Sequence, residues 1–162
     1  MTIAKFTHVS EERWRQDAPT GADCMGIAEI PIPVRATPGS AGYDFVTPFK
    51  AVIPPGGSLI IPTGIRAEMQ QGWVLMIFPR SSLGFRYGAR LCNTVGIIDS
   101  DYAQADNEGH ILIKMLNDSG KALVLEKGER FCQGVFLQYG LAEEAETPKD
   151  ARTGGLGSTG SQ

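Results

Sequence analysis

The stretch SLIIPTGIRAEM (residues 58–69) contains two short apolar runs on either side of a Pro-Thr-Gly turn. Short runs of this kind, bounded by turn residues, are typical of β-strands. The others are GIAEIPIPVR (26–35), WVLMIF (73–78), TVGII (94–98), HILIKML (110–116), ALVLEKG (122–128) and RFCQGVFLQY (130–139). The 20 glycines and 10 prolines cluster between these runs. This spacing predicts an all-β sandwich or barrel.

Helical signals are few. The segment SEERWRQD (10–17) favours a short helix with Ser10 as its N-cap. A further single helical turn is expected after Arg80, capped by Ser81 or Ser82. We therefore predict an all-β fold with one short helix and this additional turn.

The C-terminal end differs in composition from the rest of the chain. After Tyr139, GLAEEAETPKDA (140–151) is acidic, and ARTGGLGSTGSQ (151–162) consists mainly of Gly, Ser and Thr. Neither segment has the periodicity of an element that packs on a core. We predict one β-domain over residues 1–140, with residues 1–25 as an N-terminal extension. Residues 141–162 would form a flexible C-terminal arm.

The composition argues against several classes of partner. With a net charge of −3, the chain lacks the basic excess by which proteins bind nucleic-acid polymers. No apolar run approaches the ~20 residues of a membrane span, and the first residues lack a signal-peptide core. Cys24, Cys92 and Cys132 are odd in number and widely spaced, which argues against disulfides or a zinc site. We expect a cytoplasmic protein without membrane contact or metal-ligating residues.

Five segments carry residues suited to nucleotide chemistry: AGYDF (41–45), PRSSLG (79–84), NTVGIIDSDY (93–102), GERFCQ (128–133) and RTGGLGSTG (152–160). Asp99 follows an apolar strand, where a carboxylate can act as a general base. Asn93 offers both a donor and an acceptor, as needed to read the edge of a nucleobase. Taken singly, each segment is also common as a turn, a core strand or a chain end.

The other candidate residues suit anionic groups. Arg80 stands beside the hydroxyls of Ser81 and Ser82, a combination that favours an oxyanion. Gln133 could position a substrate through its amide. The glycine-rich tail is not a P-loop, because it lacks the lysine and no helix can follow it. Its backbone N–H groups, beside Arg152, can still wrap a phosphate.

In this order, the five segments resemble the motifs of the trimeric dUTPases, over residues 41–160. The insert AQADNEGH (103–110) is similar to that of the subtype from Gram-positive bacteria and their phages. The resemblance implies a jelly-roll-like β-fold and a homotrimer with shared active sites. It also implies Mg²⁺-dependent hydrolysis of dUTP to dUMP and pyrophosphate. Such an activity limits uracil incorporation into DNA and supplies dUMP for dTMP synthesis.

The resemblance also assigns roles to residues. Asp99 would orient and deprotonate the water that attacks the α-phosphorus. Tyr102 would lie flat under the deoxyribose and leave no room for a 2′-hydroxyl. Uracil would be bound by the hairpin that contains Asn93, Ile97 and Ile98. The phosphates would be bound by Arg80, Ser81, Ser82 and Gln133.

By the same resemblance, the tail is a lid that closes over the site of a neighbouring subunit. Arg152 would bind the γ-phosphate, and the substrate would be wrapped by Gly155, Leu156, Gly157, Ser158 and Thr159. Mg²⁺ would bind the triphosphate oxygens and water, with Asp44 reaching it only through water. Two residues depart from the family's pattern: Leu156 replaces a Phe that stacks on uracil, and Ser82 replaces a Gly.

Two other functions remain open. A dCTP deaminase would share the fold and much of the motif order, but it uses a glutamate where Lys114 stands and lacks the tail. The second is a phage regulatory protein that binds a bacterial repressor, for which the insert at residues 103–110 offers a surface. The regulatory role could coexist with catalysis.

Overall fold

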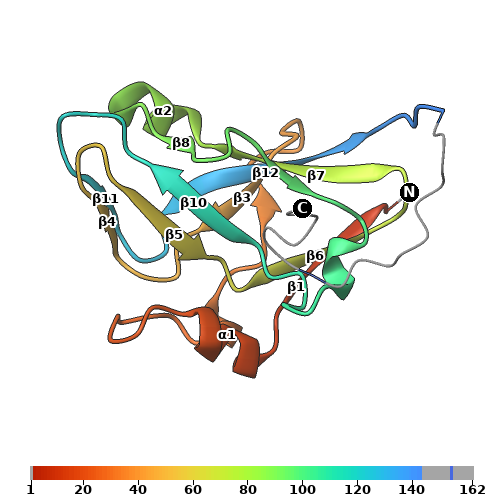
Figure 1. The fold of residues 1–162 in the computed structure, drawn as a ribbon, viewed down its shortest axis with the longest axis horizontal. Coiled ribbons are helices and arrows are strands. Elements are labelled where there is room, and N and C mark those ends of the chain that lie inside the picture. The colour runs from red at the N-terminus through yellow and green to blue at the C-terminus, as the bar shows by residue number, and fades with distance from the viewer. Residues whose placement is uncertain (1, 144–153, 155–162) are drawn as a thin grey trace, which may run out of the picture.

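The fold is given by a computed structural model that describes residues 2–143 and 154 (Figure 1). Its strands are β1 (Ala4–His8), β2 (Val34–Arg35), β3 (Tyr43–Val46), β4 (Ala51–Ile53), β5 (Ser58–Pro62), β6 (Ile65–Met69), β7 (Trp73–Pro79), β8 (Arg90–Leu91), β9 (Gly96–Ile98), β10 (Leu112–Leu116), β11 (Leu123–Leu125) and β12 (Arg130–Gln138). The helices are α1 (Glu11–Asp17) and α2 (Ser81–Tyr87), with 3-10 turns η1 (Ile27–Glu29) and η2 (Tyr102–Gln104). The prediction of an all-β fold is confirmed.

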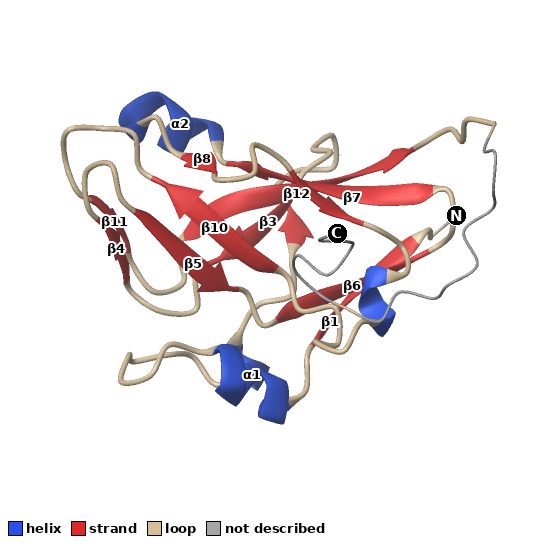
Figure 2. Ribbon diagram, viewed as in Figure 1, coloured by secondary structure: helices blue, strands red, loops and turns tan. Residues whose placement is uncertain are grey.

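The strands of the described residues pair into antiparallel sheets (Figure 2). The largest sheet has the order β2-β3-β12-β7-β9, and a second has the order β5-β10-β8. β1 pairs with β6, and β4 pairs with β11. Most neighbours within a sheet are distant in sequence, so the connections cross between layers, which is the jelly-roll arrangement.

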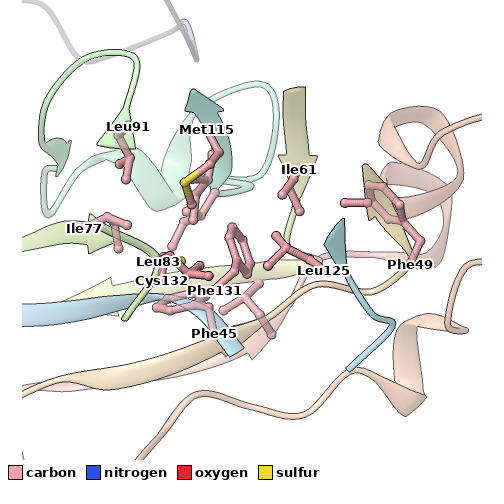
Figure 3. Close-up of a cluster of buried hydrophobic side chains, with 14 of the residues drawn as sticks. Phe45, Phe49, Ile61, Ile77, Leu83, Leu91, Met115, Leu125, Phe131 and Cys132 are labelled. Carbon is pink, nitrogen blue, oxygen red and sulfur yellow. The ribbon is translucent and has the colours of Figure 1, made fainter. Parts of the chain in front are cut away.

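The hydrophobic core lies between these layers. Figure 3 shows Met115 of β10 and Ile61 of β5 on one side of Phe131 of β12, with Phe45 of β3 on the other. All four side chains are at most 1% exposed. Truncating a buried aromatic such as Phe131 to alanine typically costs about 3–5 kcal/mol of stability. The core therefore holds the strands that carry the candidate site.

Strand β12 contains an irregularity that orients a predicted site residue. Its register with β3 shifts between Arg130 and Cys132, so both Phe131 and Cys132 are buried. Gln133 consequently falls on the opposite face of the sheet, directly across from Asp44. A β-bulge of this kind redirects side chains at the edge of a site.

Helix α1 begins as the sequence predicts. The Ser10 hydroxyl accepts a hydrogen bond from the Arg13 backbone N–H at 3.1 Å, which is N-cap geometry. The helix buries Trp14, whose indole N–H donates to the Met25 carbonyl at 3.1 Å. β1 and α1 thus pack against the rest of the fold, and the boundary of the extension at residue 25 stays a prediction. Neither helix of the described region is long and apolar enough to cross a membrane.

Residues 26–35 differ from the continuous strand that their alternation predicts. They form η1 and the two-residue strand β2. The Glu29 carboxylate accepts the Gly26 N–H at 2.7 Å, which stabilises a turn, and Pro31 and Pro33 cannot donate to a strand ladder.

The expectation for the second helix was wrong in two respects. α2 has seven residues rather than one turn, so the described residues contain two short helices. Its N-cap is Arg80, without a side-chain cap bond, and Ser81 and Ser82 are its first two residues. The helix starts there because the Arg80 N–H donates to the Phe131 carbonyl while its own carbonyl accepts the Leu83 N–H. Strands β1, β4 and β8 were not anticipated.

Candidate active site

An acidic residue bridges two arginines at one end of the five-stranded sheet. Asp44 of β3 lies 3.5 Å from Nε of Arg80 and accepts a hydrogen bond from Nη1 of Arg130 at 3.0 Å. The Asp44 side chain is only 12% exposed, so both arginines hold it in a partly buried position. The arrangement concentrates positive charge beside the start of α2. Sequence reasoning missed Arg130, although its place in the segment GERFCQ was a signal.

Gln133 lies beside this cluster and needs a glycine next to it. A Cβ atom added at Gly42 would lie 3.2 Å from the Gln133 Cδ and 3.3 Å from its Cβ, and would overlap its Oε1. Only glycine therefore leaves the Gln133 amide in its present position. Ser81 and Ser82 are exposed on the first turn of α2, next to Arg80. The structure therefore brings together five of the predicted residues: Asp44, Arg80, Ser81, Ser82 and Gln133.

The hairpin that includes β9 carries a second group of predicted residues. β9 pairs with β7 through Leu75 opposite Ile98 and Ile77 opposite Gly96. Asn93 is exposed in the preceding turn. Ile97 is 53% exposed on the outer face of the sheet, whereas Ile98 packs against the core.

Asp99 and Tyr102 follow directly after this hairpin. Asp99 is exposed one residue beyond β9, and its carbonyl accepts the Tyr102 N–H at 3.1 Å. Tyr102 is buried in η2. Its hydroxyl donates to the His110 carbonyl at 3.0 Å and accepts a hydrogen bond from the Asn107 amide at 2.8 Å.

A single chain keeps the two groups apart. Gln133 pairs with Phe78, whereas Asp99 lies one residue past Ile98, which pairs with Leu75. This corresponds to about four residues along the strands and about two strand spacings across the sheet. At about 3.3 Å per residue and about 4.8 Å per strand, Gln133 and Asp99 are roughly 16 Å apart.

A pocket of about 420 Å³ lies elsewhere, beside β1 and β3. Its walls include Phe6, Tyr43, Trp73 and Phe136, and Arg35 also lines it. None of the described residues that we predict for the site lines this pocket. The predicted lid residues Arg152, Gly155, Leu156, Gly157, Ser158 and Thr159 lie outside the described residues. Within the described part of the chain, no group of three His, Cys, Asp or Glu side chains could hold a metal ion.

Comparison with known proteins assigns the chain to a family. The sequence model of the dUTPase family matches residues 28–160. The chain belongs to the dUTPase family. The deoxyuridine 5′-triphosphate nucleotidohydrolase of Lactococcus lactis is 47% identical over 135 residues, which cover 82% of this chain and 90% of that protein.

Solved structures agree with this membership. The crystal structure of the dUTPase from Streptococcus mutans matches with a TM-score of 0.67 and 36% identity, covering 86% of this chain and 98% of that one. The dUTPase of the Staphylococcus aureus phage phi11, a mutant of which coordinates a structural Mg(II) ion, shares the fold with a TM-score of 0.66. That protein is 16% identical, over 91% of this chain and 98% of its own. The family match favours the dUTPase alternative over a dCTP deaminase.

Proposed function

We propose that this chain hydrolyses dUTP to dUMP and pyrophosphate. The proposal is carried by the family match over residues 28–160, which includes both groups of candidate residues. The 47% identical relative from Lactococcus lactis is named for the same reaction. Lys114, where a deaminase would need its glutamate, is exposed on β10.

In the proposed reaction, Asp99 is the general base. It accepts a proton from a water molecule while the water oxygen forms a bond to the α-phosphorus. The bond between the α-phosphorus and the bridging oxygen breaks, and pyrophosphate leaves. The exposed position of Asp99 just past β9 gives it access to a bound substrate. General-base assistance of this type typically contributes about 10²–10⁴ in rate.

The basic cluster at the start of α2 would bind the phosphates. Arg80, oriented by Asp44, would form charge-assisted hydrogen bonds to them, with the hydroxyls of Ser81 and Ser82 alongside. Gln133 would contact the α-phosphate. The hairpin residues Asn93, Ile97 and Ile98 would bind uracil, and Tyr102 would lie under the deoxyribose.

The residues present fit an Mg²⁺ ion that is bound through the substrate. Both carboxylate oxygens of Asp44 already face arginines, so this carboxylate is poorly suited to direct coordination. Mg²⁺ commonly keeps several waters and binds substrate phosphates. When bound, it would neutralise charge on the phosphate oxygens. Arg80 would then orient the triphosphate beside it.

We further propose a homotrimer in which each site combines residues from different subunits. Support comes from the separation of Gln133 and Asp99, and from the outer face of the five-stranded sheet. Across three strands of this face, Val135 lies opposite Met76, and Met76 opposite Ile97. Val34 and Leu137 on the same face are 65% and 43% exposed. An apolar sheet face of this kind fits a second copy of the chain.

Three finer predictions extend this proposal. The tail from Arg152 to Thr159 would act as the lid of a neighbouring site. The protein would work in the cytoplasm. A repressor partner for the insert at residues 103–110 stays a prediction.

The test is pyrophosphate release with Mg²⁺ from dUTP, dCTP, dTTP and UTP. We expect release from dUTP alone, and a loss of about 10²-fold or more in Asp99→Asn. Asp23→Asn makes the same chemical change at an exposed residue paired with Lys127, and should behave as the native chain. Release from none of the nucleotides, or equal rates in Asp99→Asn and the native chain, would contradict the proposed reaction or its base.

A further inference from the structure

Helix α1 lies outside the region that the family model matches, yet it is bonded to the loop that carries Tyr102. We call residues 102–110 the Tyr102 loop. Its other side is fixed by the fold itself, because Arg66 of β6 donates to the Ala103 carbonyl at 2.7 Å. The two ends of α1, Ser10 and Asp17, each hold a different residue of the Tyr102 loop.

The first contact joins Ser10 to Glu108. The Glu108 carboxylate accepts the Ser10 backbone N–H at 2.7 Å and the Ser10 hydroxyl at 2.6 Å. These bonds lower the pKa of Glu108. Glu108 has a φ of 59° and Gly109 a φ of 71°, a left-handed conformation that is unfavourable for a glutamate. The hydrogen bonds to α1 therefore stabilise a loop conformation that its own backbone disfavours.

The second contact joins Asp17 to His110, which is completely buried. The His110 Nε2 accepts the Gly64 backbone N–H at 2.8 Å, so this nitrogen carries no proton. Nδ1 is then the protonated nitrogen and donates to the Asp17 carboxylate at 2.6 Å. The imidazole is held between the turn that joins β5 to β6 and the last residue of α1.

Tyr102 is bonded directly to His110, so its position depends on that of His110. The His110 carbonyl accepts the Tyr102 hydroxyl, which Asn107 also contacts. The loop is closed tightly, since a Cβ added at Gly109 would lie 2.6 Å from the Ala103 Cα. Because the loop is packed this tightly, even a small shift of the His110 ring should move the Tyr102 side chain.

We propose that α1 is a positioning element for Tyr102, and that Asp17 and His110 are the positioning residues through which it acts. The inference rests on the proposed function, in which Tyr102 excludes the 2′-hydroxyl of a ribonucleotide. Selection for the deoxyribose then depends on a helix that precedes the family domain. α1 touches no substrate in this account and contributes only through the Tyr102 loop.

The test compares Asp17→Ala, Asp17→Asn and the control Arg15→Ala. Arg15 lies on the same helix, and among the described residues its ion-pair partner is the exposed Glu11. For each variant, kcat and KM are measured with dUTP and with UTP. Asp17→Ala should lower the ratio of kcat/KM for dUTP to that for UTP by about tenfold, because misplacement by a fraction of an ångström is costly. Asp17→Asn keeps an oxygen that can accept the His110 N–H and should retain most of the ratio.

A lower melting temperature in Asp17→Ala with an unchanged dUTP-to-UTP ratio would show a purely structural role and overturn the inference. If Asp17→Ala does not fold, Glu108→Ala replaces it, since this change removes the bonds to Ser10 and leaves the hydrogen bond between Asp17 and His110 in place. Amide hydrogen exchange supplies a readout that is independent of turnover. Exchange in the Tyr102 loop should quicken in Asp17→Ala and stay unchanged in Arg15→Ala. A native chain that turns over no dUTP would refute the proposed function, while unchanged exchange would refute the role of α1.

Discussion

Two variants that are each inactive should restore activity when they assemble together. Arg80→Ala removes the predicted phosphate ligand, and Asp99→Asn removes the predicted base. Gln133 lies beside Arg80. Within one chain, the strand register and spacing place Gln133 roughly 16 Å from Asp99. One α-phosphate cannot contact residues so far apart. We therefore expect each site to take Asp99 from one subunit and Arg80 from another.

The size of the effect follows from symmetry. In trimers assembled at random from equal amounts of the two variants, about half of the subunits supply an intact Asp99. About half of their neighbours supply an intact Arg80, so about one quarter of the sites should contain both. A site built within one chain would never contain both, and the mixture would stay inactive.

The assay is pyrophosphate release from dUTP by co-expressed variants that carry different affinity tags. Purification through both tags isolates the mixed trimers, in which about one third of the sites should contain both intact residues, and light scattering gives their mass. A double variant with both substitutions is the matched control, since it should rescue neither single variant. Mixed assemblies that contain both chains but release no pyrophosphate would refute the shared site.

Three further outcomes are expected. Gly42→Ala should displace the Gln133 amide and lower kcat/KM for dUTP about tenfold. The free energy of unfolding, measured with urea, should change by less than about 1 kcal/mol. Burial lowers the pKa of His110 below its usual 6.5, against the opposing pull of the carboxylate it hydrogen-bonds. Its contribution to stability is therefore complete above pH 6.5 and is lost as the pH falls below that value, because the unfolded chain takes up the proton first. Urea unfolding at about pH 7.5 and about pH 5.5 should show a smaller loss in His110→Gln than in the native chain. Cys92 is exposed, whereas Cys132 is buried and its burial raises the pKa of its thiol. A thiol reagent should therefore label Cys92 first and Cys132 only after unfolding. Equal labelling rates at the two cysteines would contradict this prediction.

Local patterns were sufficient where one segment decides its own structure. The strands around residues 58–69 and 73–78, and the capped helix after Ser10, follow from apolar runs and a hydroxyl at the right place. The stretch at 26–35 misled because alternation alone ignores the missing donors of Pro31 and Pro33. Strand β1 was overlooked since its pairing partner, β6, lies about sixty residues away and leaves no local sign.

The candidate site shows the same division. Asp99 and Arg80 stand out as polar residues at the ends of apolar runs, and Gln133 as an amide within one. The ion pair between Asp44 and Arg130 depends on the bulge in β12 and on the pairing of β12 with β3. Neither feature can be predicted from the local sequence. The bonds from α1 to Glu108 and His110 join residues more than ninety positions apart. Such contacts are set by the three-dimensional fold rather than by any motif.

The attachment of the N-terminal residues to late parts of the chain affects how the protein is made. Ser10 leaves the ribosome early, but its partner Glu108 is 98 residues further on. At typical synthesis rates of ~5–20 residues per second, the first segment waits roughly 5–20 s for that partner. For about the first sixty residues of this interval the edge of β1 is also unpaired, because β6 has not yet been made. The contacts that fix α1 can therefore form only after the Tyr102 loop has been made.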